Sequence, residues 1–176
     1  MRVFYALTLP PLIQEHCLNT IKDLRNEYQF KDIRWTSPDH LHITIRFLEN
    51  IDEAQVNTIN SLLQEQLKKC QTITISTRKL IVFPAKRPHI IALAVHLNLE
   101  LANLVRTLNQ TLSSVGIKLE KRPFVAHITL GRFRETTHTE DFTFNHIKTI
   151  EDMANRVVLF KSEPTESGSV YTPLKT

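Results

Sequence analysis

A strand–helix–strand pattern occurs twice along the chain, and this repetition restricts the possible folds more than any other feature. Each copy contains an apolar run, then a stretch with helical spacing, then a strand-like segment with a His-x-Thr triplet: residues 3–9, 11–28 and 41–48 in the first copy, and residues 89–95, 99–116 and 122–133 in the second. His42 follows Ala6 by 36 residues, and His127 follows Ala92 by 35. Such near-equal spacing indicates an internal duplication. We therefore expect a single domain over 1–176, with a first repeat at about 1–83 and a second at about 89–176.

The segments outside the repeated unit favour an antiparallel sheet. Asp52 is a suitable cap for a helix that ends near Lys68 and Lys69. Further strands are predicted at residues 72–83, 142–150, 155–162 and 170–174. A tail made of short, hairpin-like strands is more typical of an α+β fold than of a parallel doubly wound fold.

The His-x-Thr triplet has little meaning when it is taken alone. A chain with 8 His and this content of Thr is expected to contain about one such triplet by chance. The two triplets gain meaning from their equivalent places in the two repeats.

Strand alternation predicts which side chains lie together on one face. The polar face would carry His42, Thr44 and Arg46 in the first copy, and His127, Thr129 and Gly131 in the second. Arg132 falls on the opposite face of an ideal strand, but a bulge at Gly131 would turn it back. These polar faces can be ordinary solvated surfaces. Alternatively, they face each other across a groove.

A groove with two imidazoles is suited to acid–base chemistry near neutral pH. One neutral ring accepts a proton while a protonated ring donates one. Threonine hydroxyls can donate hydrogen bonds to the oxygens of a phosphodiester, and arginine stabilises the charge that develops at phosphorus. This chemistry requires no metal ion or cofactor.

Composition restricts the surroundings in which the chain works. The net charge of +4 favours a polyanionic partner, though weakly. The two cysteines, Cys17 and Cys70, are far apart and are expected to be reduced, partly buried thiols. No apolar run is long enough to cross a bilayer, and the N-terminus is not typical of a signal peptide. We expect a cytoplasmic protein with no membrane contact.

The segments HITIRF and HITLGRF resemble the paired His-x-Thr motifs of the 2H phosphoesterases, and most closely those of the RNA 2′,3′-cyclic phosphodiesterases, once called 2′-5′ RNA ligases. The likeness extends over most of the chain: it includes MRVFYALTLP, RWTSPDHLHITIRFLENID, FPAKRPHIIALAV and LFKSEPTESGSVYTPL. The chain departs from the family at Glu49 and Asn50, where many members have Gly-Glu, and at Ala126, where Pro is usual. Neither departure touches an acid–base group.

This resemblance implies two pseudo-symmetric lobes whose antiparallel sheets face a basic central cleft, with helices outside. It also implies metal-independent opening of a terminal 2′,3′-cyclic phosphate to a 2′-phosphate. Separately, we expect a monomer that needs no cofactor and no obligate protein partner. Carried over by position, His42 and His127 are the catalytic pair. Thr44, Thr129 and Arg132 hold the phosphate, Arg46 is a further candidate from strand alternation, and Tyr171 matches a family tyrosine without an assigned task.

Several alternatives stay open from the sequence. The protein could act on small cyclic or 2′-5′-linked nucleotides, could join such ends as a ligase, or could be a binding module without activity. His40 and His42 have the spacing of two metal ligands on a strand, but no third ligand accompanies them. Two Lys-Arg-Pro segments, at 86–88 and 121–123, are either solvated loops or a basic rim that follows an RNA backbone. Trp35 and Tyr5 are either core residues or surfaces on which a base stacks.

Overall fold

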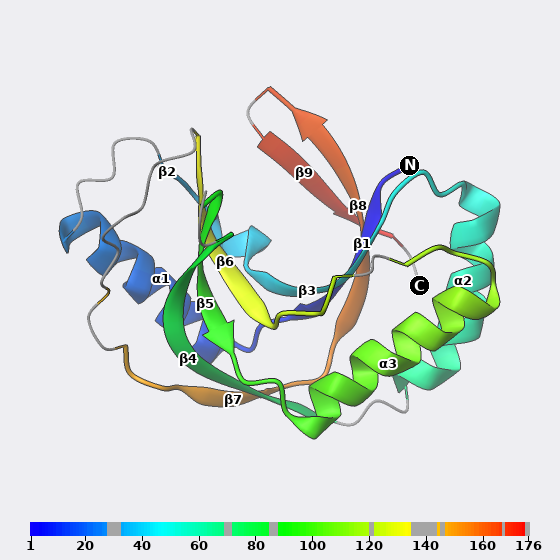
Figure 1. The fold of residues 1–176 in the computed structure, drawn as a ribbon, viewed down its shortest axis with the longest axis horizontal. Coiled ribbons are helices and arrows are strands. Elements are labelled where there is room, and N and C mark those ends of the chain that lie inside the picture. Colours follow the sequence, from blue (N-terminus) through cyan, green and yellow to red (C-terminus); the bar gives the residue numbers. More distant parts are fainter. Residues whose placement is uncertain are drawn as a thin grey trace.

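A computed structural model describes residues 1–27, 33–68, 72–84, 88–119, 122–134, 144, 147–166 and 168–174. Figure 1 shows the order of the elements along the chain. The elements are β1 (Val3–Thr8), α1 (Pro11–Glu27), β2 (Ile33–Trp35), the 3₁₀ turn η1 (Pro38–His40), β3 (His42–Leu48), α2 (Glu53–Lys68), β4 (Ile73–Phe83), β5 (Ile90–Val95), α3 (Leu99–Ser114), β6 (His127–Phe133), β7 (Glu151–Ala154), β8 (Val157–Thr165) and β9 (Gly168–Pro173).

The strands form two antiparallel sheets, which confirms the predicted α+β class. We call the sheet with the order β3-β1-β8-β9 sheet one, and the sheet with the order β2-β6-β5-β4-β7 sheet two. Each sheet contains strands from both halves of the chain. The repeats seen in the sequence therefore do not correspond to one sheet each.

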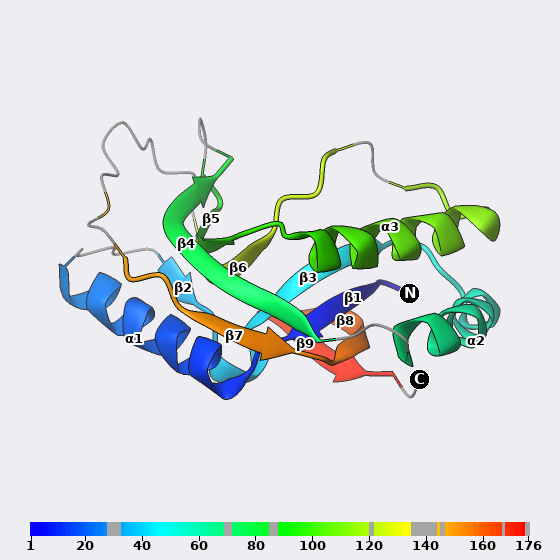
Figure 2. The ribbon, with the colours of Figure 1, turned by 90° about the horizontal axis from the view of Figure 1, so that it is seen from below.

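The helices lie outside the two sheets (Figures 1 and 2). The Tyr5 hydroxyl on β1 donates to Asn60 on α2 at 3.1 Å, which places α2 behind sheet one. Helix α3 contacts both α2 and β3, whereas α1 contacts β7 at the edge of sheet two. The large buried side chains, such as Tyr5, Ile75 and Leu104, belong to one continuous core that includes both sheets and all three of these helices.

Local signals explain where two of the helices begin. Asp52 accepts a hydrogen bond from the backbone of Gln55 at 2.7 Å, and the Gln55 side chain accepts one from the Asp52 backbone at 3.1 Å. This reciprocal pair is a capping box, so the predicted Asp52 cap is confirmed. Asn98 caps α3 by accepting from Leu101 at 2.9 Å. The chain leaves α3 through Gly116 at φ 79°, a left-handed conformation that favours glycine after a helix.

The structure corrects the predicted strand at 142–150. Its described residues, Phe144 and 147–150, lie outside any strand, and β7 begins at Glu151. Ile150 still follows β4, because its backbone N–H donates to the Thr77 hydroxyl at 3.0 Å. The Thr77 backbone N–H in turn donates to the Ile150 carbonyl at 2.9 Å, so a backbone hydrogen bond joins the two segments as well. The rest of 142–150 lies outside the described residues.

Two further boundaries differ from the prediction. The strand expected over 122–133 begins only at His127, and the short strand β2 was not expected. Three residues are too few to show a periodicity, so the sequence does not predict β2. The strand forms through its pairing with β6. It becomes the edge of sheet two beside the cavity described below.

Candidate active site

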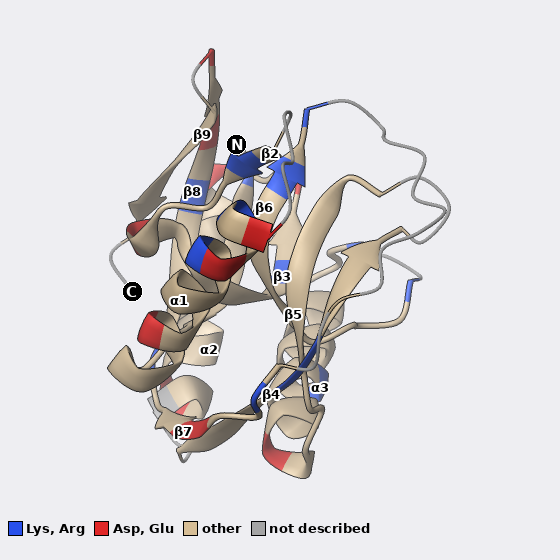
Figure 3. Cartoon of the chain, turned by 90° about the vertical axis from the view of Figure 1, so that its left-hand side faces the viewer, with Lys and Arg blue, Asp and Glu red and all other residues tan. Residues whose placement is uncertain are grey.

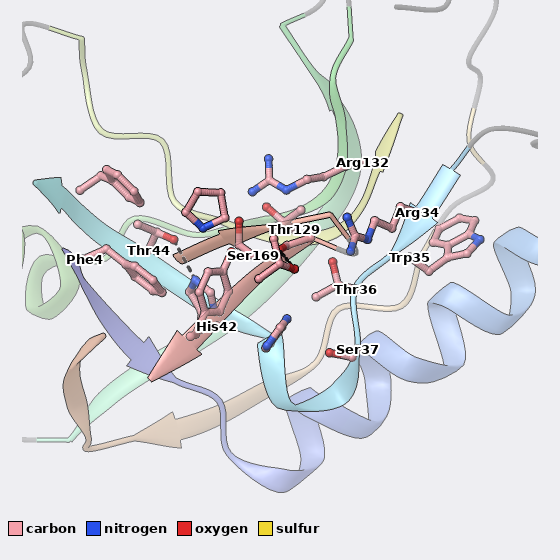
Figure 4. Close-up of a pocket in the computed structure, with 16 residues that line it drawn as sticks. Phe4, Arg34, Trp35, Thr36, Ser37, His42, Thr44, Thr129, Arg132 and Ser169 are labelled. Carbon is pink, nitrogen blue, oxygen red and sulfur yellow. Dashed lines mark hydrogen bonds between the residues drawn. The ribbon is translucent and has the colours of Figure 1, made fainter. Parts of the chain in front are cut away.

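A cavity of about 450 Å³ lies between the two sheets. It is lined from sheet one by residues of β1, β3, β8 and β9, and from sheet two by residues of β2 and β6 (Figure 4). The predicted site residues His42, Thr44, Thr129 and Arg132 all line it. Strands β3 and β6, which carry the two His-x-Thr triplets, also contact each other. Residues from both triplets therefore line one cavity.

Both triplet strands contain a bulge at the same place. Ala6 pairs with Thr44 and Tyr5 with Arg46 in sheet one, while Ala92 pairs with Thr129 and Ile91 with Gly131 in sheet two. Ile45 and Leu130 are thus the extra residues of the two bulges. Each bulge lies one residue after the threonine, so strand alternation is reversed from that point on.

The bulge in β6 turns Arg132 into the cavity, as the sequence suggested it would. Gly131 lies beside this bulge, and its close neighbours explain why it is glycine. A Cβ at this position would lie 2.7 Å from Ile33 Cγ2 and 3.1 Å from Trp35 Cε3. Glycine therefore allows β2 to pack closely against the bulged strand.

The corresponding bulge in β3 makes the expectation for Arg46 wrong. Arg46 pairs with Tyr5, whose side chain is fully buried on the α2 side of sheet one, so Arg46 shares that side. Its Nε atom is buried without a hydrogen-bond partner. Phe47, rather than Arg46, lines the cavity next to Thr44. Simple alternation missed this reversal.

His42 is held in a buried, aromatic environment. Its Nε2 atom lies 3.0 Å from the Thr44 hydroxyl, and its ring stacks on Phe4 with 5.0 Å between centroids. Burial lowers the pKa of His42 from 6.5 to about 4; a hydrogen bond to the His40 backbone opposes this shift, and the charges of His40, Arg132 and His127 add to it. His42 is therefore neutral at pH 7. The Thr44 hydroxyl can donate to it.

His127 is oriented by its own backbone. Its Nδ1 atom donates to the Val125 carbonyl at 2.7 Å, which leaves Nε2 as the acceptor in the neutral ring. His127 lies on the same face of β6 as Thr129, and its charge acts on His42. However, it is not among the residues that line the cavity as defined above.

Other residues around the cavity were not expected from the sequence. Arg34, Phe4 and Ser169 all line it (Figure 4). Tyr171, which the sequence matched to a family tyrosine, also lines the cavity. Its ring meets His42 edge-on with 5.7 Å between centroids and lies 4.5 Å from the His40 ring. Pairing with Arg132 would have revealed Arg34, but only once β2 was known.

The structure places some of the aromatic, cysteine and Lys-Arg-Pro residues whose roles the sequence left open. Trp35 lines the cavity, whereas Tyr5 belongs to the core. Cys17 is a buried free thiol whose pKa is raised to about 12 by burial. Cys70 lies outside the described residues, as do the Lys and Arg of the segment 86–88 and Lys121 of the segment 121–123.

Within the described ranges, no group of three His, Cys, Asp or Glu side chains is placed to hold a metal ion, so His40 and His42 gain no third ligand there. None of the described helices is long and apolar enough to cross a membrane.

Comparisons with known proteins give a consistent assignment. A family model of LigT-like phosphoesterases matches residues 7–92 and 91–171. The RNA 2′,3′-cyclic phosphodiesterase of Aquifex aeolicus is 31% identical over 146 residues, which cover 79% of this chain and 78% of that protein. The enzyme of the same name from Methanocaldococcus jannaschii is 26% identical over 181 residues, or 99% of each chain.

Solved structures show the same fold. The protein TT0787 of Thermus thermophilus has a TM-score of 0.83 at 22% identity, with 99% of this chain and 96% of that chain covered. The apo form of E. coli LigT has a TM-score of 0.79 at 23% identity, with 99% and 94% covered. Because the family model spans most of the sequence and the curated relatives are enzymes of one kind, this chain is a phosphodiester hydrolase that belongs to the LigT-like, or 2H, phosphoesterase family.

Proposed function

We propose that this phosphoesterase opens the 2′,3′-cyclic phosphate at an RNA end and leaves a 2′-phosphate, with His42 and His127 as its acid–base pair. The observation that carries this proposal is the matching placement of the two His-x-Thr triplets. Each lies just before an equivalent bulge, and His42, Thr44 and Thr129 line one cavity. The curated relatives are named RNA 2′,3′-cyclic phosphodiesterases, which supports the choice of substrate.

The reaction needs one proton acceptor and one proton donor. Water attacks phosphorus, a new P–O bond forms, and the bond from phosphorus to O3′ breaks. One imidazole takes a proton from the water while the other gives a proton to O3′, so the pair as a whole neither gains nor loses a proton. A new water and proton exchange with solvent then restore the starting state.

The phosphate is held by groups from both sheets. The Thr44 and Thr129 hydroxyls donate to its nonbridging oxygens, and the Arg132 guanidinium balances its charge. A bound phosphate takes the Thr44 hydroxyl away from His42 Nε2, which frees that nitrogen for proton transfer. The negative charge also raises the pKa of His42 from its low value in the free protein.

A short RNA with a 2′,3′-cyclic phosphate, incubated with the protein in excess EDTA, tests the proposal. We expect conversion to the 2′-phosphate, with kcat lower by roughly 10²–10⁴-fold in both His42→Ala and His127→Ala. Thr44→Ala and Thr129→Ala should lose less. His96→Ala, a change at an exposed histidine outside the cavity, is the matched control.

Other outcomes would lead to other functions. Turnover by both histidine variants at the wild-type rate would exclude the paired mechanism. Binding of the RNA without turnover would indicate a binding module, and turnover confined to a 2′-5′-linked nucleotide would change the substrate class. The pH dependence of kcat/KM assigns the two roles: the variant that loses the acidic limb has lost the proton acceptor.

A further inference from the structure

The cavity contains a pair of arginines that the reaction at one phosphate does not require. Arg34 on β2 and Arg132 on β6 are direct cross-strand partners, and both line the cavity. Figure 4 shows both side chains directed into it, and basic residues colour the β2 edge in Figure 3. Like charges directly opposite each other on one sheet face are destabilising. This arrangement is therefore expected where an anionic ligand compensates the charge.

The described residues offer these arginines no internal counter-charge. The 16 side chains that line the cavity include neither Asp nor Glu. The ion pairs found in the described part of the chain, Arg2 with Glu49 and Lys161 with Glu163, involve neither Arg34 nor Arg132. Both guanidiniums are thus left for a ligand.

The two arginines stand at different distances from the triplets. Arg132 lies on the same strand as Thr129, whereas Arg34 lies one strand further out, on the edge strand of sheet two. One cyclic phosphate placed between Thr44 and Thr129 accounts for Arg132. Arg34 then faces the part of the ligand that extends towards the edge of the cavity.

The opposite wall of the cavity is shaped to accommodate Arg34. Gly168, at the start of β9, packs against the Arg34 guanidinium so closely that a Cβ at Gly168 would overlap it. Gly168 also has φ 132°, a conformation that favours glycine. This contact joins sheet one to the edge of sheet two and fixes the guanidinium beside Ser169, another lining residue.

We propose that Arg34 determines specificity by binding the phosphodiester that links the terminal nucleoside to the one before it. The proposal rests on the RNA-end function proposed above. A cyclic mononucleotide has no such phosphodiester, so Arg34 makes the enzyme prefer an oligonucleotide end. Arginine suits this task because its planar fork binds two phosphate oxygens together.

The test compares kcat/KM for a 2′,3′-cyclic mononucleotide with kcat/KM for a trinucleotide ending in the same cyclic nucleotide. Arg34→Gln should lose about 10- to 100-fold on the trinucleotide, mainly through KM, and stay within about twofold on the mononucleotide. Arg34→Lys should fall between the two. The trinucleotide's dependence on log[salt] should become shallower by roughly one charge in Arg34→Gln. Arg106→Gln, which removes the same charge from α3 outside the cavity, is the matched control and should keep the wild-type ratio.

Each possible result decides a separate point. Equal losses on both substrates would overturn the inference, because Arg34 would then act on the reacting phosphate or on the fold. No loss on either substrate would overturn it as well. A wild-type protein that turns over neither cyclic substrate would instead refute the proposed function, and the inference would fall with it. Wild-type turnover of the mononucleotide keeps the two questions apart.

Discussion

At the scale of single residues, burial of His42 links the candidate site to stability. Its pKa is about 4 in the folded protein against 6.5 for an ordinary histidine, chiefly because of burial. The unfolded chain therefore binds a proton between these two pH values that the folded protein does not bind. The contribution of neutral His42 to the unfolding free energy is complete above pH 6.5 and is lost as the pH falls towards 4.

We predict that acidification from pH 7 to pH 4 lowers the unfolding free energy by about 3 kcal/mol through the titration of His42. Urea denaturation of wild type and His42→Asn at both pH values measures it, because carboxylate effects common to the two proteins cancel. His42→Asn should lose less stability on acidification by about that amount, whereas His96→Ala should follow wild type. Equal losses in wild type and His42→Asn would show that His42 is not buried in its neutral form.

Arg46 and Arg132 offer a second test at this scale. Both follow a His-x-Thr triplet, but only Arg132 lines the cavity. Arg132→Met should lower kcat/KM on a cyclic phosphate by roughly 10²-fold or more, because it removes a charge-assisted contact. Arg46→Met should keep kcat/KM within about threefold and change stability little, since the Arg46 Nε has no partner to lose. Equal losses in steady-state kinetics would contradict the assignment of faces.

At the scale of elements, the two bulges decide which side chains reach the cavity. The bulge in β6 lies next to Gly131, whose missing side chain leaves room for Ile33 and Trp35 of β2. Gly131→Ala should cost about 1–3 kcal/mol of unfolding free energy through overpacking, and should also reduce turnover by displacing Arg132. Urea denaturation and steady-state kinetics measure the two effects.

A double-mutant cycle with Ile33→Ala separates this contact from a general effect of the substitution. Ile33→Ala removes the Cγ2 atom that an added Cβ would meet at 2.7 Å. The double variant should therefore be more stable than the sum of the two single changes predicts. Strictly additive effects would show that β2 does not require a glycine at this position.

Part of the fold and of the candidate site can be predicted from the sequence, and the rest cannot, for physical reasons. Apolar periodicity and caps such as Asp52 predict most of the helices and strands. The duplicated spacing predicts that His42 and Thr129 lie close together. Those signals are local or follow the chain in order. The first bulge has no glycine beside it, so the reversal at Arg46 left no trace in the sequence. Strand β2 is short, and its position depends on pairing with β6, nearly 100 residues away.

At the scale of the whole molecule, the two halves of the chain exchange strands. Strands β8 and β9 from the second half complete sheet one beside β1, while β2 and β4 from the first half belong to sheet two. Helices follow the same exchange, because α1 contacts β7 and α3 contacts β3. Each of the two sheets that enclose the cavity therefore needs strands from both halves of the chain.

This exchange predicts that neither repeat folds alone, despite the duplication seen in the sequence. Fragment 1–84 lacks the partners of β2 and β4 in sheet two, and fragment 88–176 lacks the β1 partner of β8. Each fragment should show weak near-UV circular dichroism and no cooperative urea transition, whereas an equimolar mixture should recover both, together with turnover of a cyclic phosphate. A cooperative transition in either fragment alone would show that one repeat is a folding unit. The expected loss of cooperativity has a physical reason, because a repeat that depends on its partner's strands exposes unpaired edges and apolar faces when isolated.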